Sequence, residues 1–143
     1  MIASKARRLA TRLQREGKPL RLLVIDYAQL IRSPGKSTEE RQSGVSQGLL
    51  ALAKELQIPI LALAQLNRDC EKRADKRPQL SDLRGSGQWE QDAHAIVFVY
   101  RDAYYNPMCG HNTTELIVAK FRDHKTTTLY LKFEPQTQRF TDA

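Results

Sequence analysis

Residues 20–31 read Leu20-Arg21-Leu22-Leu23-Val24-Ile25-Asp26-Tyr27-Ala28-Gln29-Leu30-Ile31, an apolar run that a single acid, Asp26, interrupts. A run of aliphatic and β-branched residues of this length predicts a strand buried on both faces, as in a parallel sheet. An unpaired carboxylate is costly to bury, so we expect Asp26 near the carboxyl end of the strand, where open α/β sheets keep their ligand crevice. Two interpretations are open there: an acid that holds Mg2+ beside a nucleotide's phosphates, or a hydrogen-bonded Asp that starts a turn.

Composition bounds the fold class and the partners. The chain has 143 residues, 41% of them hydrophobic, which suits one core and one domain. Its net charge of +7 and sequence pI of about 9.6 favour a polyanionic partner such as nucleic acid. No apolar run approaches the roughly 20 residues that span a bilayer, and the charged amino terminus does not resemble a signal peptide. We therefore expect a cytoplasmic, reduced protein with no membrane partner.

The cysteines and histidines do not indicate a metal site. Cys70 and Cys109 are far apart in the sequence, and the three histidines show no HxxxH spacing. Cys109-Gly110-His111 offers two metal ligands, but two ligands in a glycine-containing stretch are more often a plain loop.

The first segment, residues 2–16, has apolar residues at helical spacing, and Gly17 stands in the position where a helix stops. The opposite face of this predicted helix is basic and carries Lys5, Arg7, Arg8, Arg12 and Arg15. A basic helix face is usually just solvated, and contact with nucleic acid is the second interpretation.

Gly35-Lys36-Ser37-Thr38 follows the first strand and superficially looks like a phosphate-binding loop. That motif needs a glycine five residues before Gly35, and position 30 is Leu. Pro34 also restricts the backbone where successive N–H groups should converge on a phosphate. We therefore interpret this stretch as a connection in which Ser37 caps the next helix and Glu40 completes a capping box.

A helix over residues 38–57 and a second buried strand over residues 58–65 come next. Strand, helix and strand form a βαβ crossover, which implies a parallel pair. Gln65 then ends its strand as Asp26 nearly ends the first. Because the carboxyl ends of adjacent parallel strands meet at one edge, this pairing favours the ligand-binding interpretation of Asp26.

The second half of the chain is less regular. Residues 66–80 predict a long loop of mixed charge, which in a compact domain is usually functional or disordered. The glycines of Arg84-Gly85-Ser86-Gly87 free backbone N–H groups for phosphate or simply form a tight turn. A helical turn over 88–93, a third buried strand over 95–100, and a hairpin of strands 115–122 and 128–133 at the sheet edge complete the prediction.

The chain resembles the carboxyl-terminal part of the DnaB-type replicative DNA helicases, hexameric motors with a RecA-like fold. The matching stretches follow the family's order: Leu22-Leu23-Val24-Ile25-Asp26-Tyr27-Ala28-Gln29-Leu30, Leu52-Ala53-Lys54-Glu55-Leu56, Ala64-Gln65-Leu66-Asn67-Arg68, Asp75-Lys76-Arg77-Pro78, Ser81-Asp82-Leu83-Arg84, Glu90-Gln91-Asp92-Ala93, Tyr100-Arg101-Asp102-Ala103-Tyr104-Tyr105 and Ala119-Lys120-Phe121-Arg122. The resemblance implies an α/β fold with a mostly parallel sheet flanked by helices and a carboxyl-terminal antiparallel hairpin. It implies that residues 1–143 are one partial domain, from the Walker B strand to the carboxyl terminus.

The resemblance also assigns roles at an ATP site that uses Mg2+. Asp26 matches the Walker B acid that positions the metal, and Gln65 matches the glutamine that senses the γ-phosphate. Lys120 and Arg122 match a basic pair that reaches into the neighbouring subunit's site. As both lie two apart on one predicted strand, we expect them on one face, with Phe121 toward the packed side and Glu115 pointing away from both.

Further roles follow from the same resemblance. Arg101 and Phe133 are implied to flank the nucleotide base. Arg84, Gly85 and Gly87 match the loop that holds single-stranded DNA in the central channel of the ring, although Gly85 stands where the family usually has an acid. The family's phosphate loop and catalytic glutamate have no counterpart in these residues, and Asp123-His124-Lys125-Thr126 replaces a glycine-containing turn.

We therefore expect part of an ATP-dependent helicase motor that assembles as a homohexamer on single-stranded DNA. A chain without the phosphate loop is expected to be inactive on its own. Two alternatives remain: a non-enzymatic module that binds nucleic acid or a helicase ring, and a lobe of a RecA-type recombinase or regulatory ATPase.

Overall fold

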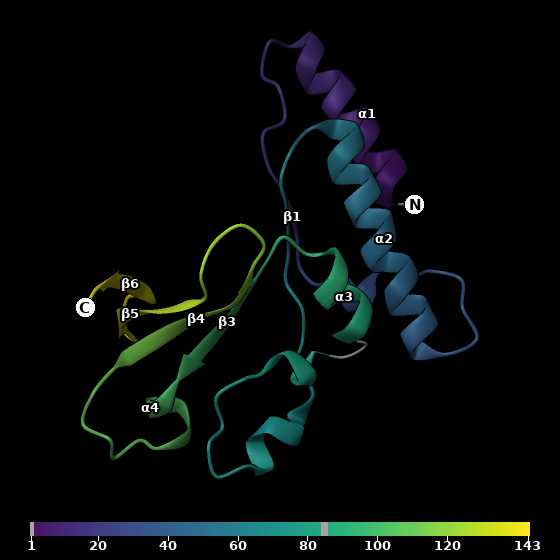
Figure 1. Ribbon diagram of the computed structural model, residues 1–143. Helices are drawn as coiled ribbons and strands as arrows, with labels where there is room; N and C mark the ends of the chain where they lie inside the picture. Colours follow the sequence, from purple (N-terminus) through teal and green to yellow (C-terminus); the bar gives the residue numbers. More distant parts are fainter. Residues whose placement is uncertain (1, 84–85) are drawn as a thin grey trace. The chain divides into compact units, whose positions relative to one another are not determined.

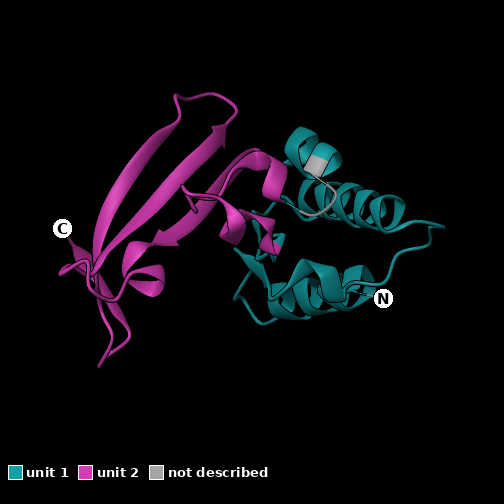
Figure 2. Cartoon of the chain, turned by 90° about the horizontal axis from the view of Figure 1, so that it is seen from below, with its two compact units in different colours: residues 1–67, 83–93 teal, residues 68–82, 94–143 magenta. Residues whose placement is uncertain are grey.

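The computed structural model describes residues 2–83 and 86–143, apart from the side chain of Ser86. Its contacts divide the chain into two compact units, which Figure 2 colours separately. Unit 1 comprises residues 1–67 and 83–93, and unit 2 comprises residues 68–82 and 94–143. The expected single domain over the whole chain stays a prediction.

Unit 1 is built on a βαβ crossover (Figure 1). Helix α1 (Ile2–Arg15) ends just before Gly17, whose φ of +71° is a left-handed conformation that glycine adopts without strain. Strand β1 (Leu23–Ile25) is followed by a turn of 3-10 helix, η1 (Ala28–Leu30). Helix α2 (Thr38–Leu56) leads to β2 (Ile60–Ala62), and α3 (Ser86–Asp92) packs against α2.

The parallel pair β1–β2 is buried on one face only. Ile25 packs with Val45 and Leu49 of α2 into the core of unit 1. On the other face, Val24 and its partner Leu61 are 53% and 52% exposed. The expectation of a strand buried on both faces is therefore wrong, because side chains alternate between the faces and α2 covers one of them. The extended strand is also shorter than expected, since the chain turns into η1.

The start of α2 confirms the capping interpretation. The Ser37 hydroxyl accepts the backbone N–H of Glu40 at 3.1 Å, as an N-cap does. The Glu40 carboxylate accepts the backbone N–H of Lys36 at 2.7 Å, one residue before the position expected for a capping box. A carboxylate thus lies against the backbone where a phosphate loop would present N–H groups to its ligand, which argues against such a loop.

Unit 2 contains an antiparallel sheet in the order β3-β4-β5-β6. Its strands are β3 (Ala95–Arg101), β4 (Thr113–Phe121), β5 (Thr127–Glu134) and β6 (Arg139–Asp142). Three short helical segments belong to the same unit: η2 (Arg68–Lys72), η3 (Leu80–Asp82) and α4 (Asp102–Tyr105). The predicted hairpin is β4–β5, which confirms two of the expected strands.

Three expectations for this unit need correction. The hairpin is not at the edge of its sheet, because β3 flanks β4 and the unpredicted β6 flanks β5. Strand β3 pairs antiparallel with β4 and is buried on one face: Phe98 is 4% exposed and Val99 is 61% exposed. The charged segment 68–82 is not a disordered loop, because η2, η3 and several ion pairs order it.

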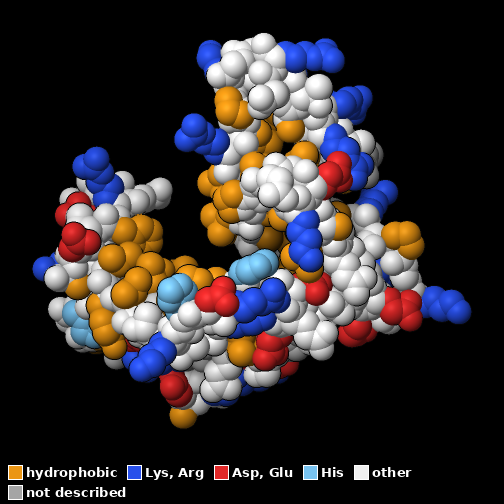
Figure 3. All heavy atoms as spheres, turned by 45° about the horizontal axis from the view of Figure 1, so that its top comes forward, with side chains coloured by type: hydrophobic (Ala, Val, Ile, Leu, Met, Phe, Trp, Pro, Cys, Tyr) orange, Lys and Arg blue, Asp and Glu red, His pale blue; other side chains and the backbone are white. Residues whose placement is uncertain are grey.

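The described surface combines apolar patches with scattered Lys and Arg side chains, as Figure 3 shows on one side of the molecule. Among the helices of the described residues, none is both long enough and apolar enough to cross a bilayer.

Candidate functional site

Asp26 follows directly after β1, at the carboxyl end of the parallel pair, where the sequence places it. It is exposed, and within the described part of the chain its carboxylate takes part in no hydrogen bond or ion pair. The Asp26–Tyr27 peptide bond is cis. An exposed carboxylate of this kind has its oxygens available for a hard cation such as Mg2+.

Gln65 lies at the same edge, three residues beyond the end of β2. Two backbone hydrogen bonds extend the pairing toward it: Leu63 N–H donates to the Ile25 carbonyl at 2.9 Å, and Ala28 N–H donates to the Leu63 carbonyl at 2.8 Å. The structure therefore holds Asp26 and Gln65 on adjacent segments that are fixed to each other. This confirms the sequence argument that the two strand ends meet.

A third residue, Gln29, fixes this arrangement and was given no role by the sequence. Its Oε1 accepts the backbone N–H of Gln65 at 3.2 Å, and its Nε2 donates to the Gln65 carbonyl at 3.1 Å. Its only sequence signal is its place in the stretch that matches the helicase family. Spacing alone could not reveal it, because the pairing joins residues 36 positions apart.

The segment after Gln65 leads to the predicted DNA loop. Leu66 forms an isolated antiparallel bridge with Leu83, and both lie in unit 1. Gly87, in the first turn of α3, has open space around its Cα, since no atom would lie within 4 Å of an added Cβ. Arg84 and Gly85, the other predicted DNA ligands, lie outside the described residues.

Lys120 and Arg122 lie at the end of β4, but the strand is not regular there. A β-bulge interrupts the pairing, so that Ile96 pairs with Lys120 and Val97 pairs with Val118. Tyr100, four residues after Ile96 and therefore on the same face of β3, pairs with Glu115. Lys120 and Glu115 thus share a face, which corrects the expectation that Glu115 points away.

The bulge also reverses the expected place of Phe121. Phe121 pairs with Ala95 and is 43% exposed, so it lies on the open face with Val97 and not on the packed side. Lys120 lies on the face that carries buried Ile96 and Phe98. Arg122 continues the pairing, because its backbone N–H donates to the His94 carbonyl at 2.8 Å.

Arg101 and Phe133, the predicted neighbours of the nucleotide base, lie together in unit 2. The Arg101 guanidinium carbon is 4.5 Å from the centre of the Phe133 ring, a cation–π contact. Phe133 also contacts Phe140 of β6, with ring centres 4.9 Å apart. The structure therefore brings this predicted pair together, on two strands that are not adjacent in the sheet.

Segment 68–82 is ordered by two arginines. Arg73 donates to both oxygens of the buried Asp82 carboxylate at 2.8 and 2.7 Å, and these bonds hold the pKa of Asp82 below its usual range. Arg77 donates to both oxygens of Glu115 at 2.9 and 2.6 Å. It also lies over the ring of Tyr100, whose pKa burial raises to about 12.

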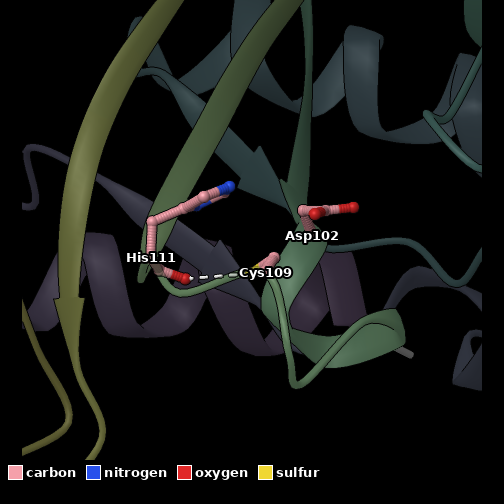
Figure 4. Close-up of side chains that lie close together, drawn as sticks. All are labelled: Asp102, Cys109 and His111. Atoms are coloured by element: carbon pink, nitrogen blue, oxygen red, sulfur yellow. Dashed lines mark hydrogen bonds between the residues drawn. The ribbon is translucent and has the colours of Figure 1, made fainter.

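Asp102, Cys109 and His111 form a further cluster in unit 2, and their ligand atoms lie within 4.8 Å of one another (Figure 4). Hydrogen bonds explain this arrangement: the Tyr100 hydroxyl donates to Asp102 at 3.0 Å, and the Cys109 thiol donates to the His111 carbonyl at 3.3 Å. Gly110, with φ of +72°, makes the turn between the last two. The loop interpretation of the sequence therefore accounts for the cluster.

Known proteins resemble this chain closely. "Replicative DNA helicase DnaB" of Geobacillus stearothermophilus is 44% identical over 99% of the chain, which covers 31% of that protein. "Replicative DNA helicase DnaB" of Leifsonia xyli subsp. xyli is 48% identical over 99% of the chain, which covers 30% of that protein. The chain thus spans about a third of the length of these relatives.

Solved structures agree with the sequence relatives. "The Structure Of A DnaB-Like Replicative Helicase And Its Interactions With Primase" has a TM-score of 0.87 and 41% identity, over 99% of this chain and 34% of that chain. A second solved structure, of an isolated ATPase domain, gives the same score and identity, over 99% of this chain and 50% of that one. The expected RecA-like α/β fold is thereby confirmed. Residues 1–142 match the family described as "DnaB-like helicase C terminal domain", and the chain belongs to this family.

Proposed function

We propose that this chain forms part of the motor of an ATP-dependent replicative DNA helicase, which moves along single-stranded DNA and unwinds duplex DNA. The observation that carries the proposal is the fixed arrangement of Asp26 and Gln65 at one edge of the β1–β2 pair. The names of the relatives support the reaction class.

Asp26 and Gln65 suit a nucleotide with its metal. The exposed Asp26 carboxylate would hold Mg2+, which when bound neutralises charge on the phosphates of ATP. The Gln65 side chain is exposed, and among the described residues only the backbone of Gln65 is hydrogen-bonded. Its amide is therefore available to contact a γ-phosphate.

The remaining residues act at neighbouring surfaces of a homohexameric ring. Lys120 and Arg122 would reach the ATP site of the next subunit, where an arginine stabilises charge on the transferred phosphoryl group. Arg101 and Phe133, already in contact, would flank the base of the nucleotide. Arg84, Gly85 and Gly87 would hold the phosphate backbone of single-stranded DNA.

A chimeric helicase tests this proposal. Residues 1–143 would replace the matching segment of the G. stearothermophilus DnaB, to which they are 44% identical. We expect a hexamer with DNA-stimulated ATP hydrolysis and unwinding, both abolished by Asp26→Ala. The matched control is Asp123→Ala, in the exposed turn after β4. A hexamer that binds ATP but neither hydrolyses it nor unwinds DNA would show that the chain is a binding module.

A further inference from the structure

Gln29 replaces a missing backbone partner at the edge of the parallel pair. The ladder between β1 and β2 continues through Leu63, which bonds to Ile25 and Ala28. Beyond that point η1 turns the first segment away from an extended path, so its backbone does not pair with Gln65. The Gln29 amide does so instead, accepting from Gln65 N–H at 3.2 Å and donating to its carbonyl at 3.1 Å.

This contact holds both sides of one peptide unit. A side-chain amide that pairs with a backbone N–H and C=O of the same residue copies the exchange of bonds between strands. Gln65 is exposed, so without Gln29 its backbone groups would bond to water and the segment would lose its last tie to β1. The position of the Gln65 side chain therefore depends on Gln29.

The next residue after Gln65 is already part of another contact. Leu66 pairs with Leu83, which immediately precedes Arg84. From Gln29 the bonded path runs through Gln65 and Leu66 to Leu83, and all four residues belong to unit 1. A displacement of Gln65 would be passed through this short path to the segment that carries Arg84.

We infer that Gln29 is a positioning residue, which fixes Gln65 at the nucleotide site and couples it to the DNA loop. The inference rests on the proposed function, since Gln65 has to face ATP for the coupling to matter. Gln29 acts through the backbone of Gln65 and is not itself assigned a contact with ATP.

Two substitutions separate the two bonds. Gln29→Glu keeps an oxygen that accepts from Gln65 N–H but loses the donor, and it places a carboxylate against the Gln65 carbonyl. Gln29→Ala loses both bonds. The matched control is Gln47→Ala, an exposed glutamine on α2 for which the described residues show no hydrogen bond.

Amide hydrogen exchange on the 143-residue chain tests the contact without any activity. In Gln29→Ala we expect the Gln65 amide to exchange about tenfold faster or more, as a lost hydrogen bond of about 1 kcal/mol or more would allow. Leu63, bonded to the backbone of Ile25, should keep its rate. Gln29→Glu should protect Gln65 better than Gln29→Ala does. Equal exchange at Gln65 in all variants would overturn the inference.

The chimeric helicase supplies the readout that a purely structural role would not move. We expect Gln29→Ala to lower the ratio of DNA-stimulated to unstimulated kcat by about tenfold or more, because small misplacements of an active-site group are costly. The KM for ATP should stay at the parent's value, and Gln29→Glu should give an intermediate ratio. A parent chimera without ATP hydrolysis counts against the proposed function, whereas an active parent with an unchanged ratio in Gln29→Ala counts against the coupling.

Discussion

Arg122 lies just beyond β4, and its backbone is fixed by the bond to His94. In the chimeric ring, Arg122→Ala should leave nucleotide binding and hexamer formation intact, because the backbone bond does not involve the side chain. ATP hydrolysis should fall by about a thousandfold or more, the scale of a lost arginine finger. Steady-state hydrolysis and equilibrium binding of a nucleotide analogue measure the two effects.

Mixed rings test whether Arg122 acts on the neighbouring subunit. Subunits with Arg122→Ala and subunits with Asp26→Ala should together regain part of the activity, since some interfaces then pair an intact Asp26 with an intact Arg122. Lys125→Ala, in the same exposed turn, is the matched control and should hydrolyse ATP like the parent. Inactive mixed rings, alongside active mixtures of each mutant with the parent, would rule out action in trans.

Lys36 should be unimportant for ATP hydrolysis, although its sequence context looks like a phosphate loop. Its backbone N–H is bonded to the chain's own Glu40 carboxylate at 2.7 Å. The chain alone should therefore hydrolyse ATP at background rate, and Lys36→Ala in the chimera should leave kcat unchanged. Measurable hydrolysis by the chain that Lys36→Ala abolishes would restore the phosphate-loop interpretation.

Asp82 should make the stability of unit 2 depend on pH. Arg73 holds its pKa below the usual range in the folded chain, so the stabilisation is present above the unfolded pKa of about 4 and is lost as pH falls through the lower folded pKa. Asp82→Asn should lower the free energy of unfolding at neutral pH by about 1–3 kcal/mol and weaken its fall in acid. Urea unfolding over a pH series measures both, with Asp123→Asn as control; identical pH profiles would contradict the assignment.

At the scale of elements, α2 offers a matched pair of glycines. A Cβ at Gly48 would meet no atom within 4 Å, whereas a Cβ at Gly44 would collide with the Ser33 hydroxyl. Gly48→Ala should raise the free energy of unfolding by about 1 kcal/mol, the ordinary gain in a helix interior. Gly44→Ala should gain less, because Ser33 has to move. Thermal or urea unfolding measures the difference, which should shrink in a Ser33→Ala background; equal gains at both glycines would show that the connection does not pack on α2.

The elements also show which structural features the sequence could predict. Both strand ends, Asp26 and Gln65, follow from apolar runs with a polar residue at the end, and the N-cap Ser37 follows from local chemistry. The bulge opposite Ile96 could not be predicted, since it depends on pairing with β4, and it moved Glu115 and Phe121 to unexpected faces. Gln29 was missed for the same reason, because its partner is distant in the sequence.

At the scale of the whole molecule, the net charge of +7 and the predicted DNA loop lead us to expect weak binding of the chain to single-stranded DNA. The affinity should fall steeply with salt and depend little on sequence, because phosphate contacts release counterions and do not read bases. Fluorescence anisotropy with labelled oligonucleotides over a salt series measures the slope, and Arg84→Ala should reduce it by about one. Salt-independent binding, or preference for one duplex sequence, would argue against a helicase channel.

The division into two units has a practical consequence for anyone who cuts or recombines this chain. The backbone passes between the units three times, at residues 67–68, 82–83 and 93–94. One protease cut therefore cannot release either unit. A gene truncated after residue 93 would still encode segment 68–82, with Arg77 deprived of Glu115. An engineer who exchanges one unit between homologues has three joints to match instead of one.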